Sequence, residues 1–322
     1  MPGSSGSSGS SARSPARRPG SPARLAGSPA RLAVAASADS PDLRQDWPLL
    51  RQALAEVGIE ASTQIWTNPD VPWRDFDLVL ANGAWDNIHR PDEFLAWIAA
   101  VSEVAPMANS PAVLRWNLDK RYLAALSEAG VATVPTTWLT PDSGEIPLPR
   151  TEFVVKPTVS GGGFETARYP AEGDERAQPA NDARPHIERL LNAGRTVMIQ
   201  PYQAAVDTDG EAGLIFLGGR YSHAIGKGPL LRLGVGPQSH LYQREQIGAL
   251  APTEAQLEMA HLALAAAERL AGPTVYARVD LVNLADGAPA ILELELLDPA
   301  LFFETNPAGA TRFAQVLRAL IP

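Results

Sequence analysis

Two short segments near the C-terminal end of the chain place carboxylates and a guanidinium at alternate positions. The first segment, YARVDLV, carries Arg278 and Asp280, and the second, AILELE, carries Glu293 and Glu295. Both are rich in β-branched and large apolar residues, which is typical of strands. Residues 283–289 between them contain Asp-Gly, so we predict that the two strands form a hairpin.

Side chains alternate along a strand, so Arg278 and Asp280 share one face of the first strand, and Glu293 and Glu295 share one face of the second. If the two faces coincide, three carboxylates and a guanidinium converge. Carboxylates packed this closely repel one another unless cations hold them, and hard oxygen ligands in this number suit Mg²⁺. The alternative is the solvated face of an exposed hairpin, and the strongly apolar residues in between argue against it.

The composition excludes several kinds of site. The 322 residues include no cysteine, which excludes disulfides, thiolate zinc sites and a cysteine nucleophile and fits a cytoplasmic location. No apolar run approaches the roughly 18 residues that span a membrane, so we expect no membrane partner. The net charge of −9 argues against nucleic acid as a partner, because nonspecific binding needs a basic patch.

Residues 1–30 differ in composition from the rest of the chain. They are rich in Ser, Gly, Pro, Ala and Arg and contain no acidic residue, and the sequence Ser-Pro-Ala-Arg occurs three times up to Arg31. Such a segment buries little apolar surface, so we expect a disordered tail. A dispensable linker or an over-extended start is the favoured explanation. The alternative is an organelle transit peptide, although the amphipathic pattern of such peptides is absent.

Residues 31–112 show a strand, helix, strand, strand, helix order, which predicts a small open α/β domain with a sheet that is parallel at least in part. The expected elements include a helix over 46–57 and a helix over 93–104. The loop 82–87 follows the third strand, and loops at this position usually bind ligands.

Residues 113–200 form a second predicted part, with a helix opening at Asn117 and a strand at Phe153–Pro157 that ends in Lys156 and runs into a glycine-rich loop. Residues 201–322 form a third part. Its expected elements are a hairpin turning at Gly218-Gly219, a long helix over 254–271 and a closing helix over 313–320.

The glycine-rich loop is the second feature with clear chemistry. Three glycines let the backbone approach a ligand so that its N–H groups reach phosphate oxygens, and Lys156 at the strand end adds a point charge for the same phosphates. The spacing is not that of a Walker loop, and a glycine run alone can be an ordinary flexible loop. Gln200, followed by Pro201, ends another strand. The backbone there is free to hydrogen bond to an adenine edge, and the alternative is that the chain simply leaves the sheet at this point. Lys120, taken alone, is expected to be a solvated helix lysine, which is the commonest situation of a single lysine.

The ordered set of Lys120, Lys156 with its glycine loop, Gln200-Pro-Tyr, Arg278-Val-Asp280 and Glu293-Leu-Glu295 resembles the ATP-grasp superfamily. The similarity covers about residues 32–320 and is strongest to the group that contains the D-cycloserine-forming ligase. Glutathione synthetase and the ribosomal-protein glutamate ligase are more distant. The resemblance implies an ATP-grasp fold preceded by a small open α/β domain. Each motif is short, but the ordered set is specific.

The resemblance also implies roles for residues. The residues expected to hold the ATP phosphates are Lys120, Lys156 and a lid loop of Ser160, Gly161, Gly162 and Gly163. The residues expected at adenine and ribose are Gln200, Pro201, Tyr202, and either Asp207 or Glu211. Asp280, Glu293 and Glu295 would bind two Mg²⁺, with Mn²⁺ as the alternative ion, and Arg278 would stabilise the transferring phosphoryl group. Phosphoryl transfer needs this positioning and neutralisation more than a protein nucleophile.

Substrate residues are expected on the loop beyond the third strand and on the third part of the chain. Asp86, between Trp85 and Asn87, could pair with a substrate ammonium, and its alternative is a turn-forming aspartate. The groups expected at the substrate carboxylate are His223, Lys227 and Arg232.

Two departures from the family pattern bear on the substrate. Many relatives have Asn at the position of Glu295, although the closer ones share the glutamate. The loop 82–87 reads NGAWDN where those relatives usually have Arg-Ser-Thr-Trp-Asp-Tyr. Without this Arg, the loop lacks a guanidinium that could bind a carboxylate through two hydrogen bonds, and without this Tyr it lacks a phenolic hydroxyl.

The resemblance implies an ATP-dependent ligase that activates a carboxylate as an acyl phosphate and lets an amine attack it. The substrate is an amino-acid-like small molecule, and attack within one molecule would close a ring, as in natural-product biosynthesis. A homodimer is compatible with this interpretation. The alternatives are a small-molecule kinase of the same architecture and a non-catalytic ATP-binding module.

Overall fold

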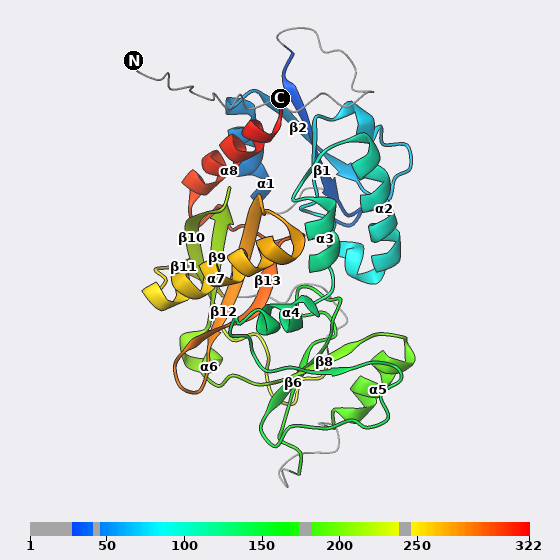
Figure 1. Ribbon diagram of the computed structural model, residues 1–322, viewed down its shortest axis with the longest axis vertical. Coiled ribbons are helices and arrows are strands. Elements are labelled where there is room, and N and C mark those ends of the chain that lie inside the picture. Colours follow the sequence, from blue (N-terminus) through cyan, green and yellow to red (C-terminus); the bar gives the residue numbers. More distant parts are fainter. Residues whose placement is uncertain (1–27, 41–45, 174–181, 238–245) are drawn as a thin grey trace, which may run out of the picture.

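The computed structural model describes residues 28–40, 46–173, 182–237 and 246–322. The predicted tail, except for its last three residues, lies outside them. In the described part, three sheets follow one another along the long axis of the molecule (Figure 1). No helix in the described ranges is long and apolar enough to cross a bilayer.

The N-terminal sheet has the order β2-β1-β3-β4, and its strands are parallel, as predicted. Every residue of β1 except Arg31 is buried, because helices cover both faces of the sheet. The strands are β1 (Ala30–Ala36), β2 (Ile59–Ile65), β3 (Leu78–Leu80) and β4 (Met107–Ala108). The helices are α1 (Asp46–Glu56), η1 (Trp73–Asp75), η2 (Trp85–His89) and α2 (Pro91–Val104).

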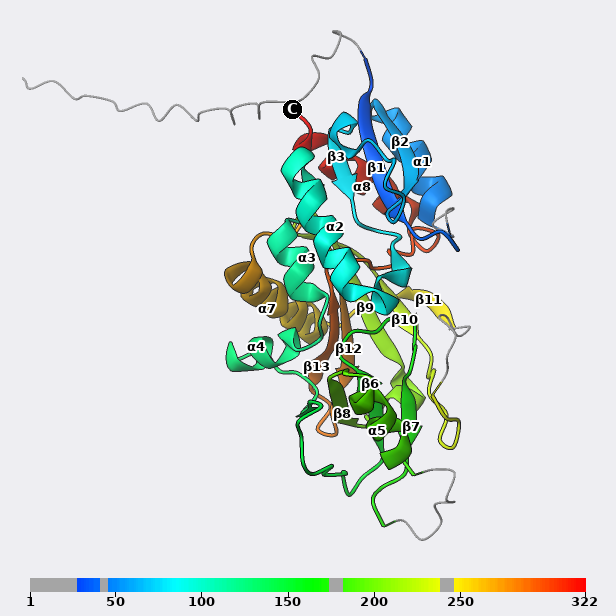
Figure 2. The same ribbon diagram turned by 90° about the vertical axis from the view of Figure 1, so that its right-hand side faces the viewer.

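The last helix, α8 (Pro307–Leu320), packs against α1 and so completes the N-terminal layer (Figure 1 and Figure 2). Phe313 and Leu317 of α8 are fully buried in one cluster with Leu32 of β1 and Leu54 of α1. The core of the N-terminal part is therefore built from both ends of the chain.

A second four-stranded sheet has the order β5-β8-β6-β7, and we call it the smallest sheet because its strands contain the fewest residues. It lies at the opposite end of the molecule, with α5 packed on it. Its strands are β5 (Thr137–Leu139), β6 (Phe153–Pro157), β7 (Ala167–Tyr169) and β8 (Val197–Pro201). The helices before and beside it are α3 (Pro111–Asn117), α4 (Tyr122–Glu128) and α5 (Arg184–Asn192). Lys156 lies in β6, directly before the glycine-rich loop.

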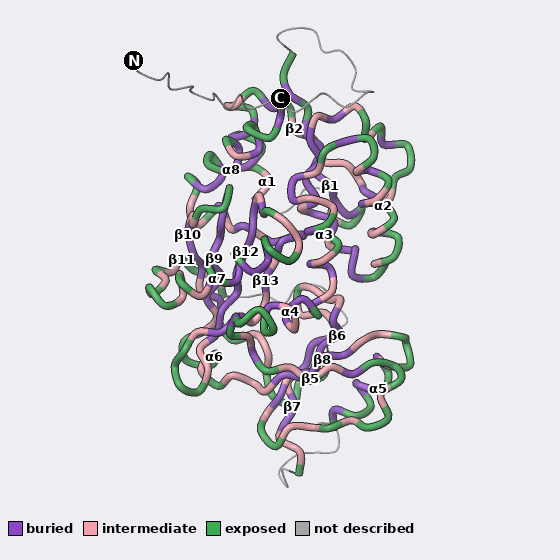
Figure 3. Tube along the Cα trace, viewed as in Figure 1, coloured by how far each residue is buried: buried purple, intermediate pink, exposed green. Residues whose placement is uncertain are grey.

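The central sheet has the order β11-β10-β9-β12-β13, and its pairings are antiparallel. Buried residues run along β9 and β12 through the middle of the molecule (Figure 3). The strands are β9 (Glu211–Leu217), β10 (Arg220–Lys227), β11 (Ile247–Leu250), β12 (Tyr276–Asn283) and β13 (Pro289–Glu295), and α6 (Val206–Asp209) precedes them.

Helix α7 (Glu254–Ala271) packs on β12 and β13. It begins with a capping box, in which Thr253 and Gln256 each bond the other's backbone N–H. Small buried residues such as Ala263 and Ala267 let it lie close to the sheet. Its bounds agree with the prediction from the sequence.

Two predicted helix starts are wrong: the closing helix α8 begins at Pro307 instead of at residue 313, and no helix begins at Asn117. Asn117 ends α3 instead of opening a helix, because Ser110 and Pro111 begin that helix earlier. The Asn117 side chain is buried, donates to the carbonyl of Leu294 and accepts the N–H groups of Leu296 and Leu297.

Asn109, which directly precedes the N-cap residue Ser110 of α3, performs a similar task. Its buried amide donates to the carbonyls of Tyr276 (2.9 Å) and Leu296 (2.7 Å) and accepts the N–H of Val275. Its φ of 54° is a left-handed conformation that asparagine tolerates better than most residues. Asn109 therefore ties the N-terminal layer to both strands of the central hairpin.

We predict that Asn109→Ala lowers the free energy of unfolding by about 3 kcal/mol, because it leaves buried backbone groups unpaired and strains a left-handed position. Urea unfolding measures this loss. Asn109→Gly is the control, since glycine fits the φ value and its loss reports the hydrogen bonds alone. A loss below about 1 kcal/mol for Asn109→Ala would contradict the assigned role.

Candidate active site

A cavity of about 700 Å³ lies where the three parts of the chain meet. The N-terminal layer contributes Trp85 and Asn87, and the smallest sheet contributes Lys156 and Gln200. The charged residues that the central sheet and its flanking segments add to the wall are Glu211, Lys227, Arg278, Asp280, Glu293, Glu295, Asp298 and Glu304.

The predicted hairpin supplies the centre of this wall. In the register of β12 and β13, Arg278 pairs with Glu295 and Asp280 pairs with Glu293. The two faces therefore coincide, and the alternative of a solvated hairpin is wrong: Asp280 is 2% exposed and Arg278 is 6% exposed.

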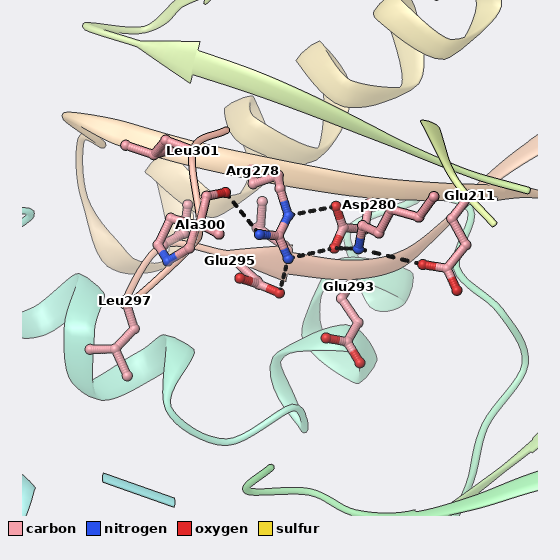
Figure 4. Close-up of polar contacts among 12 residues, drawn as sticks. Glu211, Arg278, Asp280, Glu293, Glu295, Leu297, Ala300 and Leu301 are labelled. Atoms are coloured by element: carbon pink, nitrogen blue, oxygen red, sulfur yellow. Dashed lines mark hydrogen bonds and ion pairs between the residues drawn. The ribbon is translucent and has the colours of Figure 1, made fainter. Parts of the chain in front are cut away.

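Arg278 holds two of the carboxylates and the segment that follows them. Its Nε donates to Asp280 Oδ1 at 2.8 Å, and its Nη2 donates to Asp280 Oδ2 at 3.0 Å and to Glu295 (Figure 4). Its Nη1 donates to the carbonyl of Ala300 at 2.9 Å. The ring of Phe302, a residue with a left-handed φ of 51°, lies 5.6 Å from the guanidinium carbon. A planar fork of donors makes this bidentate contact possible.

Three lysines lie against Asp280, Glu211 and Glu293. Lys227 Nζ of β10 lies 2.7 Å from Asp280 Oδ2 and 3.5 Å from Glu211 Oε2. Lys156 Nζ of β6 lies 2.6 Å from Glu293 Oε1. Lys120, between α3 and α4, lies 3.8 Å from the other oxygen of Glu293 and donates to the carbonyl of Ser160.

Burial and neighbouring charges set the pKa values. Burial favours the neutral form of Glu293, but Lys120 and Lys156 outweigh it and lower its pKa to about 2. Burial raises the pKa of Glu295 to about 7, and the nearby Asp280 carboxylate adds to the effect of burial, while Arg278 opposes it. Burial therefore outweighs the neighbouring cations at Glu295, whereas the cations outweigh burial at Glu293.

The donor set fits a hard divalent cation. Asp280, Glu293 and Glu295 offer carboxylate oxygens from adjacent strands, and Mg²⁺ prefers such oxygens. Among the described residues, however, no three acidic or histidine side chains form a ready-made metal cage. Each of these carboxylates is instead paired with a lysine or arginine.

The structure brings most of the predicted site residues together. The glycine-rich loop also lines the cavity, as do Lys120 and Lys156. Its lining residues are Ser160, Gly161, Gly162 and Gly163. The predicted hinge residues Gln200, Pro201 and Tyr202 line it as well. Gln200 is buried, and its side chain donates to Thr136 Oγ1.

The glycine-rich loop touches the N-terminal layer. The ring of Phe164 lies edge-on to His89 of η2, with centroids 4.8 Å apart. Arg195 donates to the carbonyl of Ile88 at 3.0 Å. These contacts join Phe164, which follows the loop, and Arg195, which precedes β8, to η2 of the N-terminal layer.

Four predicted residues do not line the cavity. The Asp86 side chain accepts from Trp66 Nε1 at 2.6 Å and from Arg90 Nη2 at 2.5 Å, so it holds η2 in place. Trp85 and Asn87, on either side of it, do line the cavity. The predicted ammonium contact of Asp86 is therefore wrong, because the short helical turn directs its carboxylate toward Trp66.

Asp207 accepts from the Tyr202 hydroxyl at 2.6 Å and pairs with Arg168, whereas Glu211 lines the cavity. Of the two ribose candidates, the structure thus favours Glu211.

His223 and Arg232 are the other two residues outside the wall. His223 lies further along β10, where its Nε2 is 2.8 Å from the carbonyl of Leu301 and its ring packs near Phe303. Burial lowers the pKa of His223. Arg232 is exposed, and of the three predicted carboxylate-binding groups only Lys227 faces the cavity.

Three acidic wall residues were not among the predicted ones. Asp46, the first residue of α1, accepts the backbone N–H groups of residues 301–303. Asp298 and Glu304 follow β13 in the same segment. The only signal in the sequence was that Asp298 lies three positions beyond Glu295.

Comparison with known proteins identifies a matching family model and similar proteins. Residues 32–109 match the family model described as the N-terminal domain of D-cycloserine synthetase DcsG. The cycloserine biosynthesis protein DcsG of Streptomyces lavendulae is 38% identical over an aligned length of 298 residues, and the match covers 88% of this chain and 96% of that protein. The crystal structure of D-cycloserine synthetase DcsG matches with a TM-score of 0.81 at 36% identity, covering 91% of this chain and 100% of that one.

Two more distant structures share the fold. D-alanine–D-alanine ligase from Bacillus anthracis matches with a TM-score of 0.62 at 16% identity, over 91% of this chain and 96% of that one. The ATP-grasp ligase PsnB, complexed with a precursor variant, Mg and ADP, matches with a TM-score of 0.56 at 16% identity, over 91% of this chain and 99% of that one.

Gly213 of β9 offers a test of the wall's geometry, because it pairs with Asp280. A Cβ at this position would lie 2.9 Å from Asp280 Oδ1 and 2.9 Å from Ile225 Cδ1. Asp280 is fixed by Arg278 and Lys227, so we predict that Gly213→Ala displaces it, lowers stability by about 1–3 kcal/mol and weakens Mg-ATP binding. Thermal unfolding and calorimetry measure the two effects.

Gly226→Ala in β10 is the matched control, since its Cβ would meet only Leu250, at 3.9 Å. It should leave both quantities close to those of the unchanged protein. Equal effects from the two substitutions would contradict the assigned role of Gly213.

Proposed function

The chain belongs to the ATP-grasp ligase family that includes the cycloserine biosynthesis protein DcsG, and from this we propose that it forms an amide bond within one amino-acid-like molecule, with closure of a ring. ATP activates the carboxylate, and an amine of the same molecule attacks it. The single observation that carries the proposal is the wall in which Lys120, Lys156 and Arg278 alternate with Asp280 and Glu293 around one cavity.

Lys120 and Lys156 are placed to bind ATP phosphates. Both are buried at the end of the cavity beside the glycine-rich loop, and their shared partner is Glu293. Buried ammonium groups that face one carboxylate leave a surplus of positive charge for an anionic ligand. The loop backbone of Gly161, Gly162 and Gly163 can approach the same phosphates.

Adenine would lie near Gln200 and Tyr202, where β8 leaves the sheet, and Glu211 would meet the ribose. Asp280, Glu293 and Glu295 would hold two magnesium ions. When bound with ATP, Mg²⁺ neutralises the phosphate oxygens and so favours transfer of the terminal phosphoryl group. Arg278 would stabilise the charge that develops on that group and on the later tetrahedral intermediate.

The reaction balances without a protein nucleophile. A substrate carboxylate oxygen attacks the terminal phosphorus of ATP and displaces ADP, which gives an acyl phosphate. The amine nitrogen then attacks the acyl carbon, the C–O bond to phosphate breaks, and the amine loses a proton. The products are an amide, ADP and phosphate.

Of the substrate contacts expected from the sequence, we keep three in the proposal: Lys227, Trp85 and Asn87. Lys227 would meet the carboxylate before activation, although its bonds to Asp280 and Glu211 must be shared with it. In the family pattern that the sequence resembles, the loop 82–87 would carry an Arg and a Tyr, whereas this chain has Asn82 and Asn87 at those positions. We therefore propose a substrate that differs from the one used by DcsG.

The domain boundaries at residues 31, 113 and 201 remain part of the proposal. The central sheet begins at Glu211, after the third of these boundaries. Helix α8 belongs to the third part by sequence but packs on the N-terminal layer, so the boundaries describe the order of the chain better than its packing.

We predict that ADP is released only with ATP, Mg²⁺ and one class of amino-acid derivative in a coupled screen of amino acids, dipeptides and their derivatives. Mass spectrometry should show an amide lighter than its substrate by one water molecule, together with free phosphate. A stable phosphoester would show a kinase instead. A screen without ADP formation for any compound would favour a non-catalytic module.

We predict that Glu293→Gln lowers ADP release by about 100-fold or more, because a charged ligand is lost while the hydrogen bond to Lys156 is kept. The matched control is Glu258→Gln on the exposed side of α7, which should retain full turnover. Thermal unfolding should show that both variants fold. Near-normal turnover of Glu293→Gln at ordinary Mg²⁺ would refute the metal assignment.

A further inference from the structure

One part of the cavity wall is apolar. Val134, Val206 and Val282 line the cavity there, are buried in a small cluster of their own, and have Tyr202 packed against them. Val282 lies two residues beyond Asp280 on β12, and both residues line the cavity. This part of the wall therefore suits the flat base of a nucleotide, whose phosphates would reach the charged residues around Asp280.

Arg168 lies on the same side of the smallest sheet as this part of the wall. Arg168 of β7 pairs with Val154 of β6, which in turn pairs with Gln200 of β8. Residues directly opposite one another in a sheet project from the same face. Val154 and Gln200 line the cavity, whereas Arg168 does not, so the Arg168 side chain lies beyond the lining, on the outermost strand of the row.

The guanidinium of Arg168 stacks on the ring of Tyr202. The guanidinium carbon lies 3.5 Å from the ring centroid. The negative face of an aromatic ring attracts a cation at this distance, and the planar guanidinium can lie flat against it. A stacked partner restricts the few torsions of the Tyr202 side chain, so Arg168 fixes the position of a ring that lines the cavity.

Two carboxylates close a ring of contacts around this pair. Arg168 Nε donates to Glu152 Oε2 at 2.8 Å, and its Nη1 donates to both oxygens of Asp207 at 3.3 Å. The Tyr202 hydroxyl donates to Asp207 Oδ1 at 2.6 Å, and the Tyr202 N–H donates to the carbonyl of Glu152 at 2.7 Å. Each of the four residues therefore contacts at least two of the others.

This ring of contacts crosses the connection between two sheets. Glu152 directly precedes β6 and Arg168 lies in β7, whereas Asp207 lies in α6, which leads to the central sheet. Tyr202 directly follows β8, between the two parts. The side chains of Glu152 and Asp207 are 40% and 44% exposed, and ion pairs this exposed contribute little to stability. The position of Tyr202 is therefore the main consequence of these contacts.

Arg168 is not placed to bind the phosphates itself. Its Nε and Nη2 donate to Glu152, and its Nη1 donates to Asp207, so carboxylates already neutralise its charge. The lysines that line the cavity beside the glycine-rich loop are Lys120 and Lys156. An effect of Arg168 on nucleotide binding would therefore concern the base and not the phosphates.

We propose that Arg168 is a positioning residue for the adenine of ATP. It holds Tyr202 against the apolar part of the wall, so that the base meets a surface that is already in its binding geometry. The proposal rests on the function proposed above and adds to it a residue outside the cavity lining. Because a preorganised wall lowers the ordering cost of binding, loss of Arg168 weakens the part of the affinity that comes from the base.

The test compares two ligands that differ by the nucleoside. One is a nonhydrolysable ATP analogue and the other is inorganic tripolyphosphate, each with Mg²⁺, and calorimetry measures their affinities for the full chain. Arg168→Met keeps an unbranched side chain and removes the guanidinium. It should weaken binding of the ATP analogue about tenfold and change binding of tripolyphosphate by less than about twofold.

Arg184→Met in α5 is the matched control. Arg184 also pairs with a carboxylate, that of Glu172, but it does not line the cavity, so both affinities should stay unchanged. Both variants should unfold within about 4 °C of the unchanged protein. Tyr202→Leu removes the stacked ring. If Arg168 acts through that ring, the double variant should bind the ATP analogue no more weakly than Tyr202→Leu alone.

Each outcome decides between a role in positioning and another role. Equal losses for both ligands in Arg168→Met, unchanged binding of both, additive losses in the double variant or a large drop in unfolding temperature would overturn the role of Arg168. An unchanged protein that binds the ATP analogue no more tightly than tripolyphosphate would refute the adenine position itself. Binding needs no amino-acid substrate, so a screen that finds no amide product would refute the proposed ligase reaction and leave the result for Arg168 intact.

Discussion

The pairing of Asp280 with Arg278 and Lys227 is the interaction on which the central sheet depends. A carboxylate that is 2% exposed is tolerated only with opposite charges in contact, and here they come from β12 and β10, on either side of β9. Removing one partner of such a group typically costs about 3–5 kcal/mol. The network therefore pins three strands in one register and leaves room in β9 for nothing larger than glycine at position 213.

The same network explains how the protein folds although many positive and negative side chains are buried in this site. Without ligands, lysine and arginine groups neutralise the carboxylates of β12 and β13, and Glu295, whose pKa is raised to about 7, can carry a proton at neutral pH. A triphosphate competes for the cations and a metal ion competes for the carboxylates. Both ligands thus find charges that are already desolvated and positioned, which reduces the reorganisation that binding requires.

Much of the site was predictable because it obeys local rules. Alternation along two strands placed Arg278, Asp280, Glu293 and Glu295 on one face, and a strand leading into glycines marked Lys156. The failures have a common physical cause. The directions of Asp86 and His223 depend on Trp66 and Leu301, which lie far away in the sequence, and the buried amides of Asn109 and Asn117 satisfy backbone groups of β12 and β13 that only the tertiary fold brings near.

The position of α8 has a consequence for folding of the protein during its synthesis. Phe313 and Leu317 fill the core beside β1 and α1, yet α8 is synthesised long after these two elements. Until α8 has been synthesised, the N-terminal layer has an apolar face without its cover. A truncated chain that ends before residue 307 would therefore expose a surface suited to aggregation or to capture by chaperones.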